Sequence, residues 1–98
     1  MHPDFQPCVY MLASKRNGTL YAGVTSNLAA RIHQHRNGLI RGFTRDYGVK
    51  LLVWFEPHAT MESAILREKQ IKAGSRAKKA ALITALNPDW RDLHADLT

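Results

Sequence analysis

The stretch that decides the fold runs from Cys8 to Val24 and reads CVYMLASKRNGTLYAGV. Both of its ends are apolar and rich in residues that strands favour, and a polar turn separates them. Within that turn, Asn17-Gly18 supplies the positive φ that a tight hairpin needs. We therefore expect two antiparallel strands, over residues 8–14 and 19–24.

Two tyrosines, Tyr10 and Tyr21, lie in these strands, and the hairpin loop decides how they are related. Because strand side chains alternate between faces, a loop of two or four residues puts both tyrosines on the same face of the sheet. With the four-residue loop, Tyr21 sits opposite Leu12 and is the diagonal neighbour of Tyr10. The pair is a candidate site, although two ordinary core aromatics would give the same pattern.

Capping residues and turns downstream of the hairpin mark three helices and a third strand. The helix starts are marked by Ser26 or Asn27, by Thr60 and by Ser75. The expected elements are a helix over residues 27–37, a loop with one helical turn over 39–48, a strand over 49–56, and helices over 61–73 and 76–86. This order, ββαβαα, predicts an α/β fold in which helices flank a small three-stranded mixed sheet. We expect one domain over residues 1–98, with its core over about 7–93.

The overall charge and the single cysteine limit the classes of function. The formal net charge is +6 and the pI is about 9.9, which favours a polyanionic partner such as nucleic acid. Cys8 permits no intrachain disulfide and is expected to be a small core residue, and the histidines lack zinc-ligand spacing. Residues 1–7 do not resemble a signal peptide and no apolar run suits a membrane helix, so we expect a cytoplasmic protein with no membrane partner.

The helix expected over residues 27–37 carries two polar side chains at the border of its apolar stripe. Leu28 and Ile32 form the stripe, and Arg31 and His35, one helical turn apart, flank it on one side. This arrangement places a guanidinium and an imidazole beside the sheet, where they are candidate site residues. A solvated helix edge with snorkelling side chains would give the same pattern.

Glu68 is the strongest anomaly in the sequence. It falls in the middle of the apolar face of its helix, among Met61, Ala64, Ile65 and Ile71. A buried carboxylate is costly unless it is paired or binds a metal. Two hypotheses therefore remain open: a ligand for a divalent cation, or a salt-bridge partner of Arg31 or Lys72.

Residues 67–79 are strongly basic, and Glu68 is their single acid. A solvated helical face usually has acids interspersed among its bases. We therefore predict that part of this run contacts nucleic-acid phosphates, through Lys72, Arg76, Lys78 and Lys79.

Five stretches, taken in order, carry a resemblance over about residues 7–93. They are Cys8-Val9-Tyr10, Tyr21-Ala22-Gly23, residues 21–35, residues 67–72 and the closing Asn87-Pro88-Asp89-Trp90. The ordered set resembles the GIY-YIG nuclease superfamily, in particular its small bacterial single-domain branch. The two tripeptides depart from the family's pattern at Cys8, Val9 and Ala22 but keep both tyrosines, so these changes affect packing positions.

The resemblance implies a metal-dependent endonuclease that hydrolyses phosphodiester bonds. The site residues that it implies are Tyr10, Tyr21, Arg31, His35, Glu68 and Asn87. Among them, Glu68 would hold Mg²⁺ or Mn²⁺, and Arg31 would neutralise charge on the transition-state phosphorane. One of the two tyrosines, helped by His35 or by the cation, would take the proton from the attacking water.

Three hypotheses follow for the function. The first is an endonuclease acting on DNA, more than on RNA, including structured, damaged or single-stranded DNA. The second is a nucleic-acid-binding module with weak or no catalysis, since no second module is expected to supply sequence specificity. The third is a protein-interaction domain with a vestigial site, and the joint retention of the site residues argues against it. The oligomeric state is left open.

Overall fold

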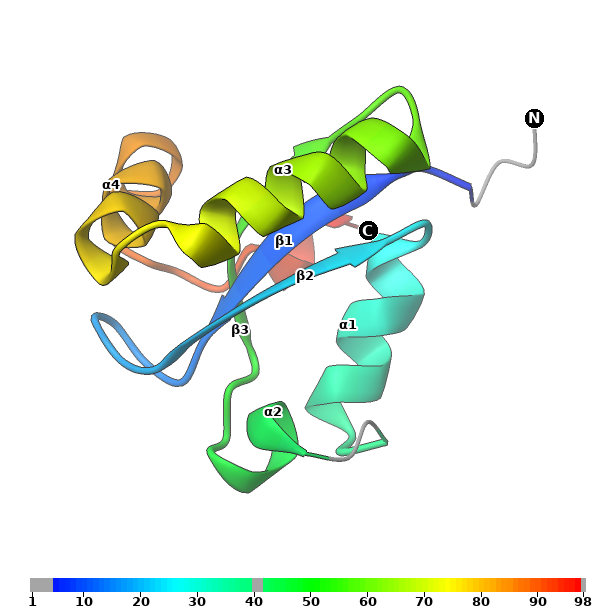
Figure 1. The fold of residues 1–98 in the computed structure, drawn as a ribbon. Helices are drawn as coiled ribbons and strands as arrows, with labels where there is room; N and C mark the ends of the chain where they lie inside the picture. Colours follow the sequence, from blue (N-terminus) through cyan, green and yellow to red (C-terminus); the bar gives the residue numbers. More distant parts are fainter. Residues whose placement is uncertain (1–4, 40–41, 98) are drawn as a thin grey trace.

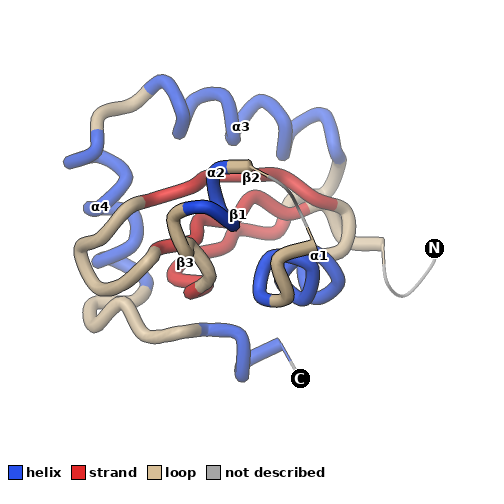
Figure 2. Tube along the Cα trace, turned by 90° about the horizontal axis from the view of Figure 1, so that it is seen from below, coloured by secondary structure: helices blue, strands red, loops and turns tan. Residues whose placement is uncertain are grey.

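A three-stranded sheet lies between two layers of helix in this computed structural model, which describes residues 5–39 and 42–97 (Figures 1 and 2). β1 (Cys8–Ala13) is the central strand, between β2 (Leu20–Thr25) and β3 (Leu51–Pro57). Both pairings are antiparallel, so the expectation of a mixed sheet was wrong. β2 and β3 run parallel to each other, but β1 separates them and no parallel pair forms.

The hairpin has the register expected for the four-residue loop. Leu12 pairs with Tyr21 and Tyr10 with Gly23, and the Ser14 N–H donates to the Thr19 carbonyl at 3.0 Å. The turn contains the positive φ that the sequence predicted, at Asn17 (φ 58°). Tyr10 and Tyr21 therefore share one face of the sheet, as predicted.

The helices occur in the expected order and begin at the expected caps. They are α1 (Leu28–Arg36), the short α2 (Phe43–Asp46), α3 (Met61–Ala73), α4 (Arg76–Leu86) and the 3₁₀ helix η1 (Leu93–Leu97). Asn27, rather than Ser26, caps α1, and Thr60 and Ser75 cap α3 and α4. α2 is the helical turn expected within residues 39–48; residues 40 and 41 of that segment, and residues 1–4 of the N-terminal one, lie outside the described residues. None of the helices in the described part is long and apolar enough to cross a membrane.

Alternate residues of β1 build two separate cores, one on each face of the sheet. Val9 and Met11 pack toward α3 and α4, together with Trp54, Ile71 and Ile83. Tyr10 and Leu12 pack on the opposite face, together with Ile32, Leu52 and Leu93 from α1, β3 and η1. Figure 2 shows α3 and α1 on opposite sides of the strands. The tyrosine face is therefore the face that α1 covers.

Helix α3 turns a narrower apolar face to the sheet than the sequence suggested. Ala64 and Ile71 are buried, whereas Ile65 is 39% exposed, so its placement on the buried face was wrong. Glu68 shares the buried face, because it lies four residues after Ala64 and three before Ile71, and its side chain is only 15% exposed. A carboxylate thus occupies a position that an apolar side chain would normally fill.

The C-terminal segment returns under β3 and is held by Asp92. This carboxylate accepts hydrogen bonds from the backbone N–H groups of Leu52 (3.3 Å) and His94 (3.0 Å) and pairs with Arg36. Burial alone would raise the pKa of Asp92, but these hydrogen bonds and the charge of Arg36 lower it overall. Trp90 and Leu93 are buried, one in each of the two cores, which docks the tail in the way that the sequence indicated.

Candidate active site

Three aromatic rings converge on the face of the sheet that α1 covers. The Tyr10 and Tyr21 ring centroids are 6.3 Å apart, and the His35 ring lies 5.8 Å from Tyr10 and 5.6 Å from Tyr21. The tyrosines come from neighbouring strands, and His35 comes from the last turn of α1. The structure therefore brings together three of the side chains that the sequence proposed.

Gly23 makes room for the Tyr10 ring. It pairs directly with Tyr10 across the hairpin, and a Cβ atom at this position would lie 2.5 Å from the Tyr10 hydroxyl oxygen and 2.6 Å from Cζ. The Tyr10 side chain is fully buried and cannot simply swing aside. The glycine of the Tyr21-Ala22-Gly23 motif is thus required for space, a role that the sequence analysis did not assign.

His35 is buried and hydrogen-bonded through both ring nitrogens. Nε2 lies 3.0 Å from the Tyr10 hydroxyl, and Nδ1 lies 3.0 Å from the Thr44 hydroxyl of α2. Burial lowers the pKa of His35, and the nearby positive charge of Arg31 lowers it further, which favours a neutral imidazole. Sequence reasoning missed Thr44, because no periodicity or motif marks it before α2 folds against α1.

Tyr10 is held in its protonated form. Burial raises its pKa above the usual range, and Tyr21 and the carboxylate of Glu68 add to this shift. The Arg31 guanidinium opposes the shift, by its charge and by hydrogen bonding, but does not reverse it. Both Arg31 and Glu68 therefore act electrostatically on the Tyr10 hydroxyl. A neutral imidazole beside a protonated phenol forms an uncharged Tyr10–His35–Thr44 chain.

Glu68 approaches the cluster from α3, which packs on the other face of the sheet. Its Oε1 lies 3.5 Å from Lys72 Nζ, and that ammonium lies 6.0 Å from the Tyr21 ring centroid. Because β2 is an edge strand, side chains from the two faces can meet there. The candidate site therefore lies at the β2 edge. Glu68 does form a salt bridge with Lys72, one of the two partners expected, but the pair is not buried because the Lys72 side chain is 51% exposed.

The donor set around Glu68 suits a weakly held oxygen-loving cation better than a zinc ion. Within residues 5–39 and 42–97, no group of three or more His, Cys, Asp or Glu side chains could hold a metal. Mg²⁺ in proteins is typically bound through one or two carboxylates, with water and substrate phosphate as further ligands. The mostly buried carboxylate of Glu68 can supply one such ligand, and the positively charged side chains near it can bind the substrate phosphate.

Asn87 is not part of the cluster. Its side-chain amide donates to the carbonyls of Val53 (3.1 Å) and Arg91 (2.8 Å), and its oxygen accepts from the Arg91 N–H at 3.2 Å. These bonds join the end of α4 to β3 and to the C-terminal turn. The buried amide is thus engaged with backbone groups, and we infer a structural role for Asn87.

Cys8 is buried in β1, as expected for a small core residue. Burial is the main cause that raises the pKa of its thiol to about 11, so the thiolate is scarce at neutral pH. A role for Cys8 as a nucleophile is therefore disfavoured.

His35 should make the fold sensitive to acid. The pKa of a histidine in the unfolded chain is about 6.5, and that of folded His35 is lower. Below about pH 6.5 the unfolded state binds the proton more readily, so the free energy of unfolding should fall as pH falls toward the folded pKa and change little above pH 7. Denaturant unfolding between pH 5 and 8 measures this slope. A His35→Asn variant is the control: whatever its stability, an unchanged slope would rule out His35 as its source.

The comparisons with known proteins agree with this geometry. Residues 6–81 match the model of the GIY-YIG catalytic domain. The chain therefore belongs to the GIY-YIG family, whose domain is of the nuclease type. The relatives that it matches include UPF0213 proteins. One from Clostridium perfringens is 40% identical over 77 residues, which cover 79% of this chain and 82% of that protein.

Two further relatives support the same placement. A UPF0213 protein from Vibrio cholerae is 36% identical over 81 residues, covering 82% of this chain and 80% of that protein. The solution NMR structure of the UPF0213 protein from Bacillus halodurans is 31% identical, with a TM-score of 0.51 over 82% of this chain and 84% of that one. The small single-domain branch that the sequence resembled is thus confirmed.

Proposed function

We propose that this protein is a metal-dependent endonuclease that hydrolyses phosphodiester bonds in DNA. One observation carries the proposal: the rings of Tyr10, Tyr21 and His35 form one cluster between the sheet and α1, and the charges of Arg31 and Glu68 act on Tyr10. The net charge of +6 favours a polyanionic substrate. The third hypothesis, a vestigial site, gives no reason for a carboxylate to be kept on the buried face of α3.

Glu68 would hold the divalent cation, Mg²⁺ or Mn²⁺, which when bound supplies positive charge to stabilise the phosphate in the transition state. Arg31 would stabilise the same charge from α1, with a planar guanidinium suited to phosphate oxygens. Lys72 would balance the carboxylate before substrate arrives, since the two side chains are 3.5 Å apart.

The two tyrosines differ in solvent exposure, and we therefore assign them different roles. Tyr10 is fully buried and its pKa is raised, so it would act as a positioning residue through His35. Tyr21 is partly exposed and lines an open groove. We therefore assign to Tyr21 the contact with the attacking water. As the new P–O bond forms, a proton of the water would pass to the deprotonated Tyr21 oxygen, the P–O bond to the leaving sugar oxygen would break, and that oxygen would take a proton from solvent water.

Replacing each tyrosine with phenylalanine tests these roles. Tyr21→Phe should lower the cleavage rate by roughly 10²–10⁴-fold, the usual contribution of a general base, with little change in stability. Tyr10→Phe should instead cost about 1–3 kcal/mol of stability, because the buried Nε2 of His35 loses its partner, and should lower the rate less. Equal rate losses in two fully folded variants would contradict the division.

The activity itself is tested by incubating the purified protein with labelled single-stranded, duplex and branched DNA. We expect cleavage of at least one form with Mg²⁺ or Mn²⁺ and none with EDTA, and the same forms in RNA test the preference for DNA. Binding without cleavage under every metal condition would instead support a nucleic-acid-binding module with weak or no catalysis.

A further inference from the structure

A groove runs along the outer edge of β2, next to the candidate active site. It has a volume of about 440 Å³ and is lined by residues of β2, α3, α4 and the turn before β2: Thr19, Leu20, Tyr21, Ala22, Lys72, Arg76 and Lys79. Tyr21 belongs both to this groove and to the ring cluster with Tyr10 and His35. The groove therefore adjoins the candidate active site at Tyr21.

Backbone carbonyls, not carboxylates, hold two of the groove's cations. The Arg76 guanidinium donates to the carbonyls of Asn17 (2.8 Å) and Gly18 (2.7 Å) in the hairpin turn. The Lys79 ammonium donates to the Gly74 carbonyl at 3.0 Å. Among the residues that the structure describes, neither cation forms a salt bridge. Their positive charge is thus positioned but not neutralised.

The third cation, Lys72, joins the groove to the site. Its ammonium lies near both the Glu68 carboxylate and the Tyr21 ring, and half of its side chain remains exposed. Within residues 5–39 and 42–97, no acidic side chain lines the groove. Three cations along one edge strand, without an acid among the lining residues, form a surface suited to a chain of phosphates.

We propose that this groove binds the sugar–phosphate backbone of the strand that is cut, at the phosphates adjoining the scissile linkage. Tyr21 marks the end at which the scissile phosphate lies, and Arg76 and Lys79 contact the phosphates that follow. The other lining residues come from β2 and the turn before it. The groove would therefore recognise the charge of the phosphates and would not read the base sequence. The proposal rests on the proposed nuclease function for the position of the cut.

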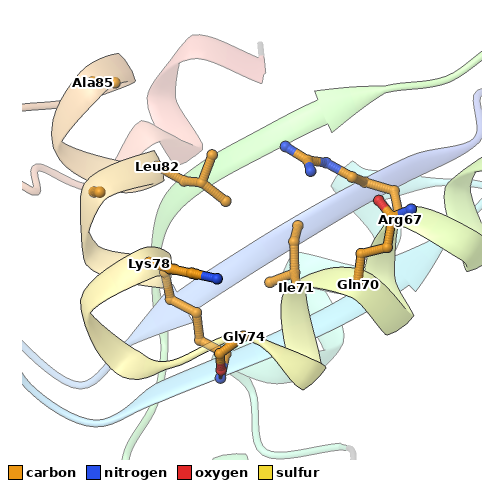
Figure 3. A pocket seen from close by; sticks show the side chains of 9 residues that line it. Arg67, Gln70, Ile71, Gly74, Lys78, Leu82 and Ala85 are labelled. Atoms are coloured by element: carbon orange, nitrogen blue, oxygen red, sulfur yellow. Dashed lines mark hydrogen bonds between the residues drawn. The ribbon is translucent and has the colours of Figure 1, made fainter.

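Lys78 lies outside this groove and supplies a matched control. It lines a separate pocket of about 400 Å³ between α3 and α4, with Ile71, Leu82 and Ala85 (Figure 3). The basic run that the sequence suggested as one phosphate surface is therefore divided by the fold. Lys79 lines both hollows, so it does not separate them. The groove and the pocket are distinguished by Arg76 and Lys78, which are both exposed on the first turn of α4.

The test compares Arg76→Gln with Lys78→Gln. Glutamine removes the charge at position 76 and keeps a polar side chain, but it is too short to reach the turn carbonyls, so the melting temperature is measured alongside. Affinity for a fluorescein-labelled single-stranded oligonucleotide is measured by anisotropy in EDTA over a range of salt concentrations. Arg76→Gln should weaken binding on the order of five- to tenfold near 0.1 M salt and reduce the salt slope by roughly 0.7–0.9, whereas Lys78→Gln should change neither. Lys72→Gln, at a half-exposed side chain, repeats the test should Arg76→Gln melt early.

A scan of the oligonucleotide with single uncharged methylphosphonate linkages locates the contact. Wild-type protein should lose affinity at one or two linkages beside the cleaved one, and Arg76→Gln should be insensitive at the same place. Equal affinities and salt slopes for Arg76→Gln, Lys72→Gln and Lys78→Gln would overturn the groove and leave nuclease activity intact. If Arg76→Gln loses affinity as expected but the wild-type protein cleaves no DNA in Mg²⁺ or Mn²⁺, the nuclease function would be overturned and the groove would stand.

Discussion

Glu68→Gln is expected to abolish cleavage without unfolding the protein. The single carboxylate of the site would be replaced by an uncharged amide, and the several kcal/mol of transition-state stabilisation that a bound cation supplies correspond to a loss of roughly 10²–10⁴-fold in rate. The fold should tolerate the change. The cation left behind, Lys72, is 51% exposed, and a pair of that kind contributes about 0–1 kcal/mol.

Two measurements separate this outcome from a structural role for Glu68. Mn²⁺ should raise the melting temperature of the wild type, because it binds the folded state, and should leave Glu68→Gln unchanged. Glu62→Gln, on an exposed position in the first turn of the same helix, is the matched control and should behave as wild type. A Glu68→Gln protein that loses several kcal/mol of stability, or that still cleaves DNA, would contradict the assignment.

Gly23→Ala is expected to disrupt both the fold and the site. The added Cβ would meet the Tyr10 hydroxyl oxygen at 2.5 Å and Cζ at 2.6 Å, far inside van der Waals contact. Tyr10 is fully buried and hydrogen-bonded to His35, so relief requires either moving the ring or opening the hairpin. Overpacking of this kind costs about 1–3 kcal/mol, which corresponds to a drop of roughly 5–20 °C in melting temperature for a domain of this size.

Gly74→Ala is the matched control for this prediction. A Cβ at Gly74 would have its nearest neighbour, the Ile71 carbonyl oxygen, at 3.4 Å, and the backbone φ of −78° suits alanine. This variant should melt at or slightly above the wild-type temperature, because alanine restricts the unfolded chain. Thermal unfolding of both variants, with cleavage rates below the melting temperature, completes the comparison. Similar melting temperatures for the two variants would show that Tyr10 has room to move.

The local features of the fold could be predicted from the sequence because their causes lie within a few residues. The hairpin register follows from loop length and side-chain alternation, which put Tyr10 and Tyr21 on one face. The helix starts follow from the capping side chains Asn27, Thr60 and Ser75. The strand order did not follow from the sequence: β1 lies between β2 and β3, and this order makes both pairings antiparallel instead of giving the mixed sheet that we expected.

The candidate site divides in the same way. Arg31 and His35 could be recognised because they border an apolar stripe, and Glu68 because it interrupts one. Their roles depended on contacts between distant segments: Thr44 orients His35 across nine residues, and Asn87 is engaged by β3 and by the C-terminal turn. The side of α4 on which each lysine or arginine lies depended on how α4 meets the hairpin turn.

By itself, the sequence determined that the carboxylate of Glu68 lies on an apolar helix face and that Tyr10 and Tyr21 lie on the same face of the sheet. Those properties depend on local spacing and on the cost of burying polar groups. Only the tertiary structure decided that Glu68 pairs with Lys72 near the Tyr21 ring, that Gly23 leaves space for Tyr10, and that Arg76 and Lys78 line different hollows. The reason is that each of these facts depends on how helices pack on both faces of one small sheet, and such packing joins residues that no local pattern relates.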